Sequence, residues 1–395
     1  MRWAATLDTT PALASSISDA AARLFRGLGG VEPDLVLAFV SSAHAERYDA
    51  VPELLAREFE YAAIAGSCGT GVIGESREIE QGPAIALVGA TMPGVRITTR
   101  HVEPGDLPPV YAPRSAWMRM LGPSSHDARG FVLLCDPFSV DTEHLLQGVD
   151  RAYPDVVKLG GLASGGTTAG STVLFGDGGV HRRGIVSLGF EGNVTIEATV
   201  AQGCRPVGEP SFVTASHDNL IREIDGRPPR DVLAELFDRL PAADRDLFAT
   251  SLFVGIALPG DRSVFGQGDF LIRNVLGLDA QSGALWVGAR VPERSVVQFH
   301  LRDAAASARD VQAALSHMRR SSLRPRSAGA LLFSCVGRGI GLYGQPDHDS
   351  NACRRVLGDL PLGGMFCSGE IGPVHGATYV HGYTSVFGVF SPRDV

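Results

Sequence analysis

The sequence predicts an α/β fold with α+β character, in which helices cover mixed β-sheets that also contain antiparallel hairpins. The main observation is a pattern of an apolar strand, a loop, an amphipathic helix, a glycine-rich turn and a second apolar strand. This pattern occurs at residues 35–71, 131–166 and 331–370. Each turn follows its strand start by roughly 30 residues, which is typical of an internal structural repeat. Further strand-like runs follow the turns and favour mixed sheets over a doubly wound parallel sheet.

The N-terminal part of the chain predicts one helix and then the first copy of the pattern. Thr10-Pro11 has the form of a helix N-cap followed by a first-turn proline, and an apolar stripe from Leu13 to Phe25 follows at helical spacing. Gly29-Gly30 ends this helix. We also expect a helix around residues 51–59 and a buried strand at 84–88.

The second copy follows a connection at residues 95–128 that is rich in Pro and His. Asp141 is suited to cap a helix that extends to Tyr153, because its carboxylate can accept from a backbone N–H of the first turn. Strands are then expected at 171–175, 184–190 and 194–200.

The character of the chain changes near residues 205–228, where we place a domain boundary. The expected domains are 1–205, with two copies of the pattern, and 206–395, with preceding strands and the third copy. The strands expected in the second domain before the third copy are 219–224, 252–258, 270–275, 284–287 and 295–301, and the helices are 228–240 and 303–318.

Composition and charge exclude several classes of protein. The formal net charge of −8, without a Lys/Arg block, argues against nucleic-acid binding. No apolar run is long enough to span a membrane, and the first residues do not have the form of a signal peptide. The six scattered cysteines form no CxxC pair, which predicts reduced thiols in a cytoplasmic protein without a structural zinc site or other metal.

The glycine-rich turns of the first two copies offer backbone groups rather than reactive side chains. The turn at 66–71, which contains Cys68 and Thr70, is followed by a strand, whereas a phosphate loop or a dinucleotide fingerprint needs a helix there. The turn that contains Ser164 is similar. One interpretation is close strand packing; the other is a pocket whose N–H groups bind a small anion such as a carboxylate.

The third copy carries the chemically capable side chains Cys335, Arg338, Cys367 and Glu370 in its turns. A guanidinium between two glycines can bind a carboxylate or phosphate through two parallel hydrogen bonds. If the pattern is a repeat, both turns lie at the same end of their strands, so Arg338 and Glu370 converge. The alternative is a structural Arg–Glu pair that joins two loops.

A third polar group lies just before the third copy. Gln298, His300 and Arg302 project to one face of the expected strand, because side chains alternate along a strand. This face is either solvated or lines a cavity.

Cys335 and Cys367 also suggest a nucleophile, which needs a base within hydrogen-bond reach. His300, His375 and His381 are the candidate bases from sequence. The alternative is that both thiols are small buried apolar groups.

Several of these segments resemble FIST-domain proteins. Residues 335–339, 364–373 and 381–384 resemble the C-terminal half of that family, and residues 270–279 with 298–303 resemble the start of that half. Residues 64–74 and the second copy resemble its N-terminal half, so the resemblance covers nearly the whole chain. It implies an intracellular sensory module that binds small ligands, such as amino acids, and signals to another protein. Part of the family is similar to haem-binding nitric-oxide sensors, which leaves haem as a possible cofactor.

Four functional hypotheses follow. In the first, a small-ligand sensor binds an amino acid or another small carboxylate: Arg338 and Arg302 hold the acidic group and Glu370 accepts from the amino group. The others are a haem sensor, a cysteine-dependent enzyme and a scaffold protein. The first includes a downstream signalling partner and allows a homo-oligomer.

Overall fold

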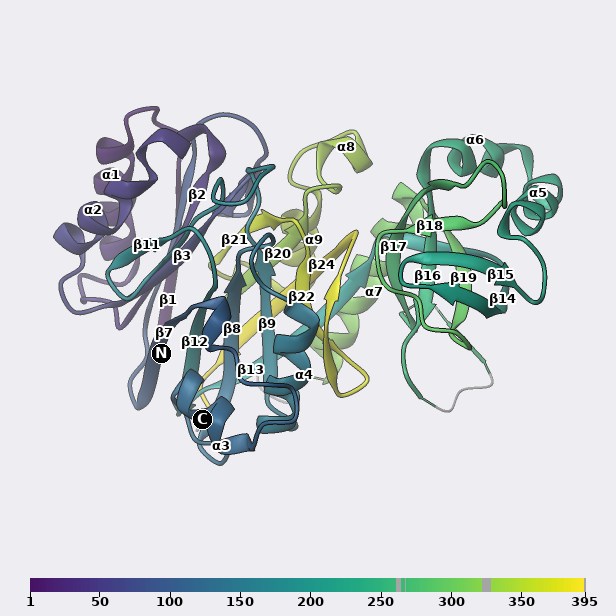
Figure 1. Cartoon of the computed structure of the whole chain (residues 1–395). Coiled ribbons are helices and arrows are strands. Elements are labelled where there is room, and N and C mark those ends of the chain that lie inside the picture. The colour runs from purple at the N-terminus through teal and green to yellow at the C-terminus, as the bar shows by residue number, and fades with distance from the viewer. Residues whose placement is uncertain (261–263, 267, 322–327, 394–395) are drawn as a thin grey trace. The chain divides into compact units, whose positions relative to one another are not determined.

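The computed structural model describes residues 1–260, 264–266, 268–321 and 328–393, and within these the strands form three six-stranded sheets and one closed barrel (Figure 1). Two compact units divide the chain. The first contains Met1–Val200, Gln312–Val380 and Thr384–Val395 and holds the three sheets; the second contains Ala201–Val311 and His381–Tyr383 and holds the barrel. The chain therefore leaves the first unit and returns to it. The contiguous division at 205/206 stays a prediction.

The first sheet has the order β1-β6-β2-β3-β10-β11. Its strands are β1 (Arg2–Asp8), β6 (Ile85–Thr91), β2 (Leu35–Ser41), β3 (Ala63–Gly69), β10 (Leu174–Gly176) and β11 (Gly179–His181). Helices α1 (Leu13–Gly27) and α2 (Val51–Glu58) accompany it, and α1 packs on β1 and β6. The expected stripe of α1 is buried from Leu13 to Leu24, but its N-cap is Ala12 rather than Thr10, and Phe25 is exposed.

The second sheet has the order β7-β12-β8-β9-β22-β23. Its strands are β7 (Val95–Val102), β12 (Ile185–Gly192), β8 (Ala128–Cys135), β9 (Val157–Leu162), β22 (Glu370–Val374) and β23 (Ala377–His381). Helices α3 (Arg114–Leu121) and α4 (Thr142–Ala152) belong to this part of the chain. Asp141 caps α4 as predicted, because its Oδ1 accepts from the backbone N–H of His144 at 3.0 Å.

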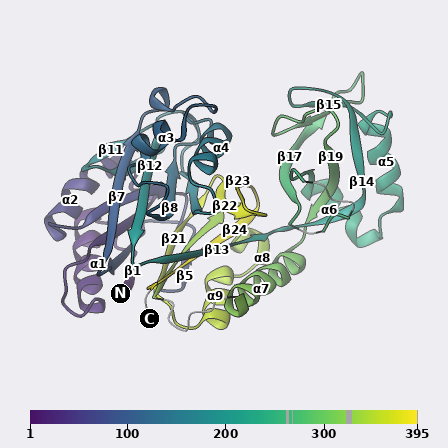
Figure 2. The same ribbon diagram turned by 90° about the horizontal axis from the view of Figure 1, so that it is seen from below.

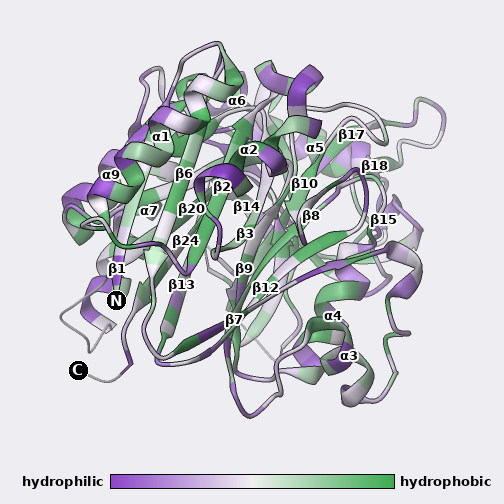
Figure 3. Ribbon diagram, turned by 90° about the vertical axis from the view of Figure 1, so that its left-hand side faces the viewer, coloured by the Kyte–Doolittle hydropathy of each residue, from purple (hydrophilic) through white to green (hydrophobic). Residues whose placement is uncertain are grey.

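The third sheet has the order β13-β24-β20-β21-β4-β5. Its strands are β13 (Thr195–Gln202), β24 (Thr384–Ser391), β20 (Gly329–Cys335), β21 (Leu362–Cys367), β4 (Val72–Gly74) and β5 (Arg77–Ile79). Helices α7 (Ala304–Ser321), α8 (Ile340–Tyr343) and α9 (His348–Leu357) lie near it in sequence. Figure 3 shows the hydrophobic colour along central strands such as β20 and β12, whereas α9 alternates polar and apolar segments.

The three sheets share one plan. Each has a central parallel pair (β2–β3, β8–β9 or β20–β21), an antiparallel strand on one side and a hairpin from another segment on the other side. In each pair one glycine approaches the opposite strand so closely that a Cβ would lie 1.8–2.0 Å from a carbonyl oxygen: Gly66 meets Ala38, Gly160 meets Leu133 and Gly364 meets Leu332. The prediction of mixed sheets with hairpins and helices is confirmed; the internal repeat stays a prediction.

The barrel of the second unit has the order β14-β15-β18-β17-β16-β19. Its strands are β14 (Cys204–His217), β15 (Leu220–Ile224), β18 (Leu285–Val287), β17 (Phe270–Leu278), β16 (Leu252–Ala257) and β19 (Val296–Arg302). Helices α5 (Pro229–Arg239) and α6 (Ala242–Ser251) pack on it (Figure 2). An apolar core that includes Val213, Leu285 and Leu301 fills it.

The sequence did not predict strands whose apolar residues alternate weakly or that lack clear turn residues at their ends. It did not predict β1, β7 or β14, nor helices α3 and α6. The residues of β14 alternate only weakly between buried and exposed, because two register shifts against β15 and one against β19 interrupt the pattern.

Candidate functional site

A buried ion pair lies beside the carboxyl end of β20. Arg338, in the turn after this strand, is 1% exposed, and its Nε and Nη2 donate to Asp349 Oδ2 and Oδ1 at 2.8 and 3.2 Å. Nη2 also donates to the hydroxyl of Tyr343. Burial alone would raise the pKa of Asp349, but the Arg338 guanidinium and several hydrogen bonds more than offset it, so that pKa lies well below its usual range. Asp349 therefore stays ionised.

Asp349 is the centre of a wider hydrogen-bond network. Its Oδ2 accepts from the hydroxyls of Ser385, at 2.6 Å, and Ser334, at 3.4 Å. His348 Nδ1 lies 2.8 Å from Oδ1, and the His348 ring stacks on Tyr343 with centroids 3.5 Å apart. Strands β20 and β24 and the first turn of α9 thus meet at one carboxylate. The hydroxyls and the guanidinium supply the partners that a buried charge requires.

Arg338 forms an ion pair with Asp349, at 2.8 Å, and its charge also acts on Glu370. The structural Arg338–Glu370 pair stays a prediction. Two of the three guanidinium nitrogens of Arg338, Nε and Nη2, donate to Asp349. Contact between Arg338 and a ligand stays a prediction.

Glu370 is the second buried acid of this cluster and has an incomplete set of partners. It begins β22 and is 0% exposed. Its Oε2 accepts from Thr384 Oγ1 at 2.8 Å and from the Thr384 backbone N–H at 3.2 Å. Its Oε1 is buried without a nitrogen or oxygen hydrogen-bond partner among the described residues, although the Cys335 thiol interacts with this carboxyl group. Since buried polar atoms are nearly always paired, this oxygen is a candidate contact for a ligand.

Burial raises the pKa of Glu370 to about 8, although hydrogen bonds from Thr384, the charge of Arg338 and the thiol of Cys335 each lower it in part. The carboxyl group is thus mostly protonated at pH 7. Cys335 and Arg338 therefore lie near enough to Glu370 to influence its pKa; a shared ligand site of Arg338 and Glu370 stays a prediction.

The β4–β5 hairpin adds two carboxylates that the sequence did not place here. Glu78 Oε1 accepts from the backbone N–H of Ser350 in α9 at 2.7 Å, and Glu80 Oε1 accepts from that of Ile340 in α8 at 2.8 Å. Burial, and next the charge of Asp349, raises the pKa of Glu78 to about 7. The hairpin therefore fixes the two short helices that carry Tyr343 and Asp349.

Cys68, Thr70 and Ser164 form a separate junction between turns. Ser164 Oγ accepts from the Thr70 backbone N–H at 2.8 Å and donates to the carbonyl of Phe366. Cys68 Sγ donates to the Ser164 carbonyl at 3.2 Å. The sequence predicted that backbone N–H groups of the turn at 66–71 could bind a small anion, but the Thr70 N–H already donates to Ser164 within the protein. The role of these residues in ligand binding stays a prediction.

Gln298, His300 and Arg302 lie on β19 of the second unit, whereas Arg338 and Glu370 lie in the first. Gln298 Nε2 donates to the Gly208 carbonyl at 2.7 Å, and Arg302 lies over the Tyr383 ring at 5.7 Å. His300 is buried against Phe270, and burial lowers its pKa to about 4, so it is neutral. A site shared with Arg338 and Glu370 stays a prediction.

The thiols have buried surroundings. All six cysteines are free and buried. Burial raises the pKa of Cys367 well above its usual value, with further increases from Glu370 and Cys335, so it remains a thiol. A nucleophile needs the opposite shift. The geometry gives the cysteine-enzyme hypothesis no support at Cys367.

The sequence did not single out several other members of the cluster, among them Glu78, Tyr343, Asp349 and Ser385. The one available signal was the placement of hydroxyl residues at the start of the apolar run 384–391. Glu78 had no such signal, because it reaches the cluster only through the β4–β5 hairpin.

Comparison with known proteins gives the family. The FIST N domain matches residues 34–227 and the FIST C domain matches residues 229–373. The chain belongs to the FIST-domain family. An uncharacterized protein of Mycobacterium tuberculosis is 33% identical over 394 residues, which cover 99% of this chain and 100% of that protein. An uncharacterized protein of Mycobacterium bovis is 32% identical over 392 residues, 99% of each chain. F-box only protein 22 of Pongo abelii is 28% identical over 103 residues, 25% of each chain.

FIST domains are small-ligand sensory and signalling domains. In this FIST protein, Arg338, Asp349 and Glu370 lie within the FIST C match and Glu78 lies within the FIST N match, so the cluster uses both. Within the part of the chain that the structure describes, no helix has the length and hydropathy needed to cross a membrane.

Proposed function

We propose that this FIST protein senses a small metabolite that carries an amino group, such as an amino acid, and that this group binds Glu370. The observation that carries the proposal is the buried Oε1 of Glu370, which has no nitrogen or oxygen partner among the described residues, although the Cys335 thiol interacts with the same carboxyl group. An ammonium group donates up to three hydrogen bonds and can satisfy this acceptor.

Strand register supports a special role for this carboxyl group. Glu370 pairs with Gly161, the residue after the closely packed Gly160. At the same register in the other two sheets, Val72 pairs with Met365 and Leu174 pairs with Ser67. All three positions are 0% exposed. A fold that accepts Val or Leu here does not need a carboxylic acid for stability.

The raised pKa of Glu370 gives the sensor a thermodynamic signature. Because the acid is mostly protonated at pH 7, binding of an ammonium group ionises it and releases a proton. The affinity for the ligand should therefore rise as the pH increases toward about 8.

Isothermal titration calorimetry with a panel of amino acids tests the proposal. In buffers of different ionisation enthalpy, the wild-type protein should release close to one proton per ligand near pH 7. Glu370→Gln keeps the shape but cannot ionise, so it should lose this release and about 10-fold or more in affinity. Glu191→Gln is a matched control, because Glu191 is also buried but pairs with Arg96 on other strands of the same sheet. Unchanged binding in Glu370→Gln would overturn the proposal.

The finer features of the sensor are also proposals. An amino acid has a carboxylate, for which Arg338 is our candidate in the same unit as Glu370. We further propose a cytoplasmic location, a downstream signalling partner and, as an option, a homo-oligomer. Among the described residues, no specific contact favours the haem sensor or the cysteine-dependent enzyme over this function.

A further inference from the structure

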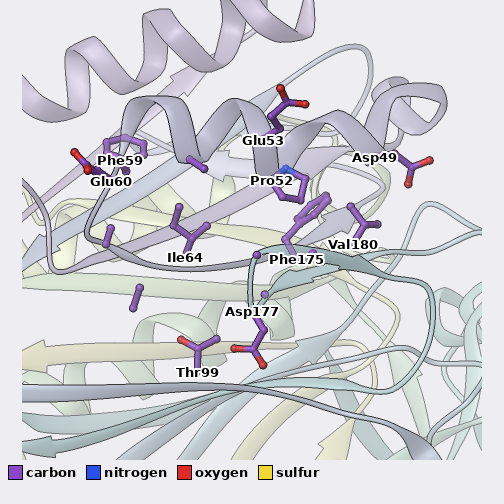
Figure 4. Close-up of a pocket in the computed structure, with 16 residues that line it drawn as sticks. Asp49, Pro52, Glu53, Phe59, Glu60, Ile64, Thr99, Phe175, Asp177 and Val180 are labelled. Carbon is purple, nitrogen blue, oxygen red and sulfur yellow. The ribbon is translucent and has the colours of Figure 1, made fainter.

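A second concave site lies in the first unit, away from the Glu370 cluster in sequence. It is a cavity of about 620 Å³, and 16 residues line it (Figure 4). They come from the segment around α2, the start of β3, the β10–β11 hairpin and Thr99 of β7. The volume is in the range of pockets that bind small organic molecules.

The lining has two chemical parts. The apolar part contains Pro52, Phe59, Ile64, Phe175 and Val180, together with three alanines. The polar part contains four carboxylates, which are Asp49, Glu53, Glu60 and Asp177. None of the lining residues is Lys, Arg or His. A ligand that fits both parts has an apolar body and a positive charge.

Two of the carboxylates have cationic partners outside the cavity, and two do not. Asp49 pairs with Arg182 at 2.9 Å, and Glu53 pairs with Arg57 on α2. Asp177 Oδ2 accepts only from the backbone N–H of His101, at 2.8 Å, among the contacts of the described residues. Glu60 has no ion-pair partner among those residues. Glu60 and Asp177 therefore retain negative charge that a cation can neutralise.

Thr99, one of the lining residues, carries a hydroxyl that its described neighbours leave unsatisfied. Thr99 Oγ1 is buried and has no hydrogen-bond partner among the described residues. Figure 4 shows the Thr99 side chain directed from β7 toward the space below Ile64 and beside Asp177. An unpaired buried hydroxyl is unfavourable unless another group hydrogen-bonds to it. An ammonium or a hydroxyl of a ligand can supply that bond.

We propose that this cavity binds a small amphipathic amine, with the apolar body against Phe59, Ile64 and Phe175 and the ammonium group near Asp177. This site is independent of the proposed sensing site at Glu370. It gives the protein a second ligand, or a second contact for a ligand with more than one amine.

The probe for this site is 2-phenylethylamine, which joins an aromatic ring to a primary ammonium group. The matched probes are 2-phenylethanol, which is neutral, and 3-phenylpropanoate, which is an anion. We expect saturable binding of the amine by protein-observed NMR, at least about 5-fold weaker binding of the alcohol, and none of the anion. Added salt should weaken amine binding because the carboxylates are near the surface. Equal binding of the amine and the alcohol would overturn the charge selection.

Three variants locate the site. Glu60→Gln with Asp177→Asn should weaken amine binding by about 5- to 10-fold. Asn suits position 177, where φ is 47°, and still accepts from the His101 N–H. Ala56→Phe fills the cavity from an exposed position of α2 and should abolish binding. Glu58→Gln removes an exposed charge of the same helix outside the cavity and should bind as the wild type does.

Glu370→Gln separates the two proposed amine sites. Binding of 2-phenylethylamine that persists in Glu370→Gln but is lost in Ala56→Phe supports the cavity. Loss in Glu370→Gln with retention in Ala56→Phe would assign the probe to the sensing site and overturn this proposal.

Discussion

The third sheet and the other two have the same strand plan but different side chains at matching register. Ser334 and Ser385 are cross-strand partners in the third sheet, where the first sheet pairs Val40 with Ile85 and the second pairs Cys135 with Ile185. In the second sheet, Glu370 of β22 stands where the third sheet has Val72 and the first has Leu174. Hydroxyl groups therefore replace apolar groups in the third sheet, and a carboxyl group replaces one in the second.

This difference identifies buried positions where apolar side chains would stabilise the fold more than the polar groups that are present. An apolar side chain at these buried positions needs no partner, whereas a buried carboxyl group needs several. The first sheet has apolar side chains at both positions. The second and third sheets each have polar groups at one of them, which Thr384 and Asp349 partly satisfy. Polar groups that stability does not require are the best guide to function.

The largest expected effect comes from placing a carboxyl group in the first sheet, at Leu174, which occupies the same register position as Glu370. Leu174→Glu should destabilise the protein by about 4–6 kcal/mol, because it removes apolar contacts and buries an acid without the partners of Glu370. Urea unfolding at pH 7 measures it. Leu174→Met is the control, with a loss of less than about 1.5 kcal/mol. A small loss in Leu174→Glu would show that the sheets tolerate this group equally.

The next effect tests whether the third sheet depends on its ion pair. Arg338→Met should destabilise by about 3–5 kcal/mol, because Asp349 is left as a buried charge without its cation. Adding Asp349→Asn should restore part of that loss. The urea-unfolding free energies of both variants provide the measurement. Equal losses in the single and double variants would contradict the coupling.

The shared plan predicts similar losses from three glycines. Ala at positions 66, 160 or 364 places a Cβ within 2.0 Å of a main-chain oxygen, which cannot move as a side chain can. Each variant should lose about 2–3 kcal/mol by thermal or urea unfolding. Gly82→Ala is not a suitable control because its φ is 86°, but Gly105→Ala, in open space, should be nearly neutral. Losses that differ widely among the three would show that the sheets are not equivalent in packing.

The smallest expected effect is a difference between wild type and Glu370→Met in how the free energy of unfolding depends on pH. Since the folded-state pKa of Glu370 is raised to about 8, the folded protein holds a proton that the unfolded chain releases above its ordinary value of 4.5. Wild-type stability should therefore fall as pH rises from 5 to 8, by at most about 1.4 kcal/mol per pH unit from this group. Glu370→Met lacks this slope, so its stability relative to wild type should increase with pH.

That comparison needs unfolding curves for both proteins at three or more pH values. Glu78, whose pKa is raised to about 7, contributes a slope of the same sign to both and cancels in the difference. Parallel curves would show that Glu370 titrates as an ordinary carboxyl group.

The sequence by itself determined the local elements and the choice of chemistry. Apolar runs and glycine-rich turns located strands such as β2, β8 and β20, since both signals arise from neighbouring residues. The concentration of Arg338, Cys335 and Glu370 in the third copy was also visible there, and Cys335 and Arg338 lie near enough to Glu370 to influence its pKa.

Only the tertiary structure determined which residues contact one another in the buried polar cluster around Asp349 and Glu370. Asp349 lies 11 residues after Arg338, and Glu78 lies 272 residues before Ser350, yet both contacts belong to one cluster. Hairpins also join sheets built from other parts of the chain, as β4–β5 joins β21. Nothing in local periodicity specifies these pairings. They depend on which buried polar groups can satisfy one another once the sheets have formed, and that is a property of the whole fold.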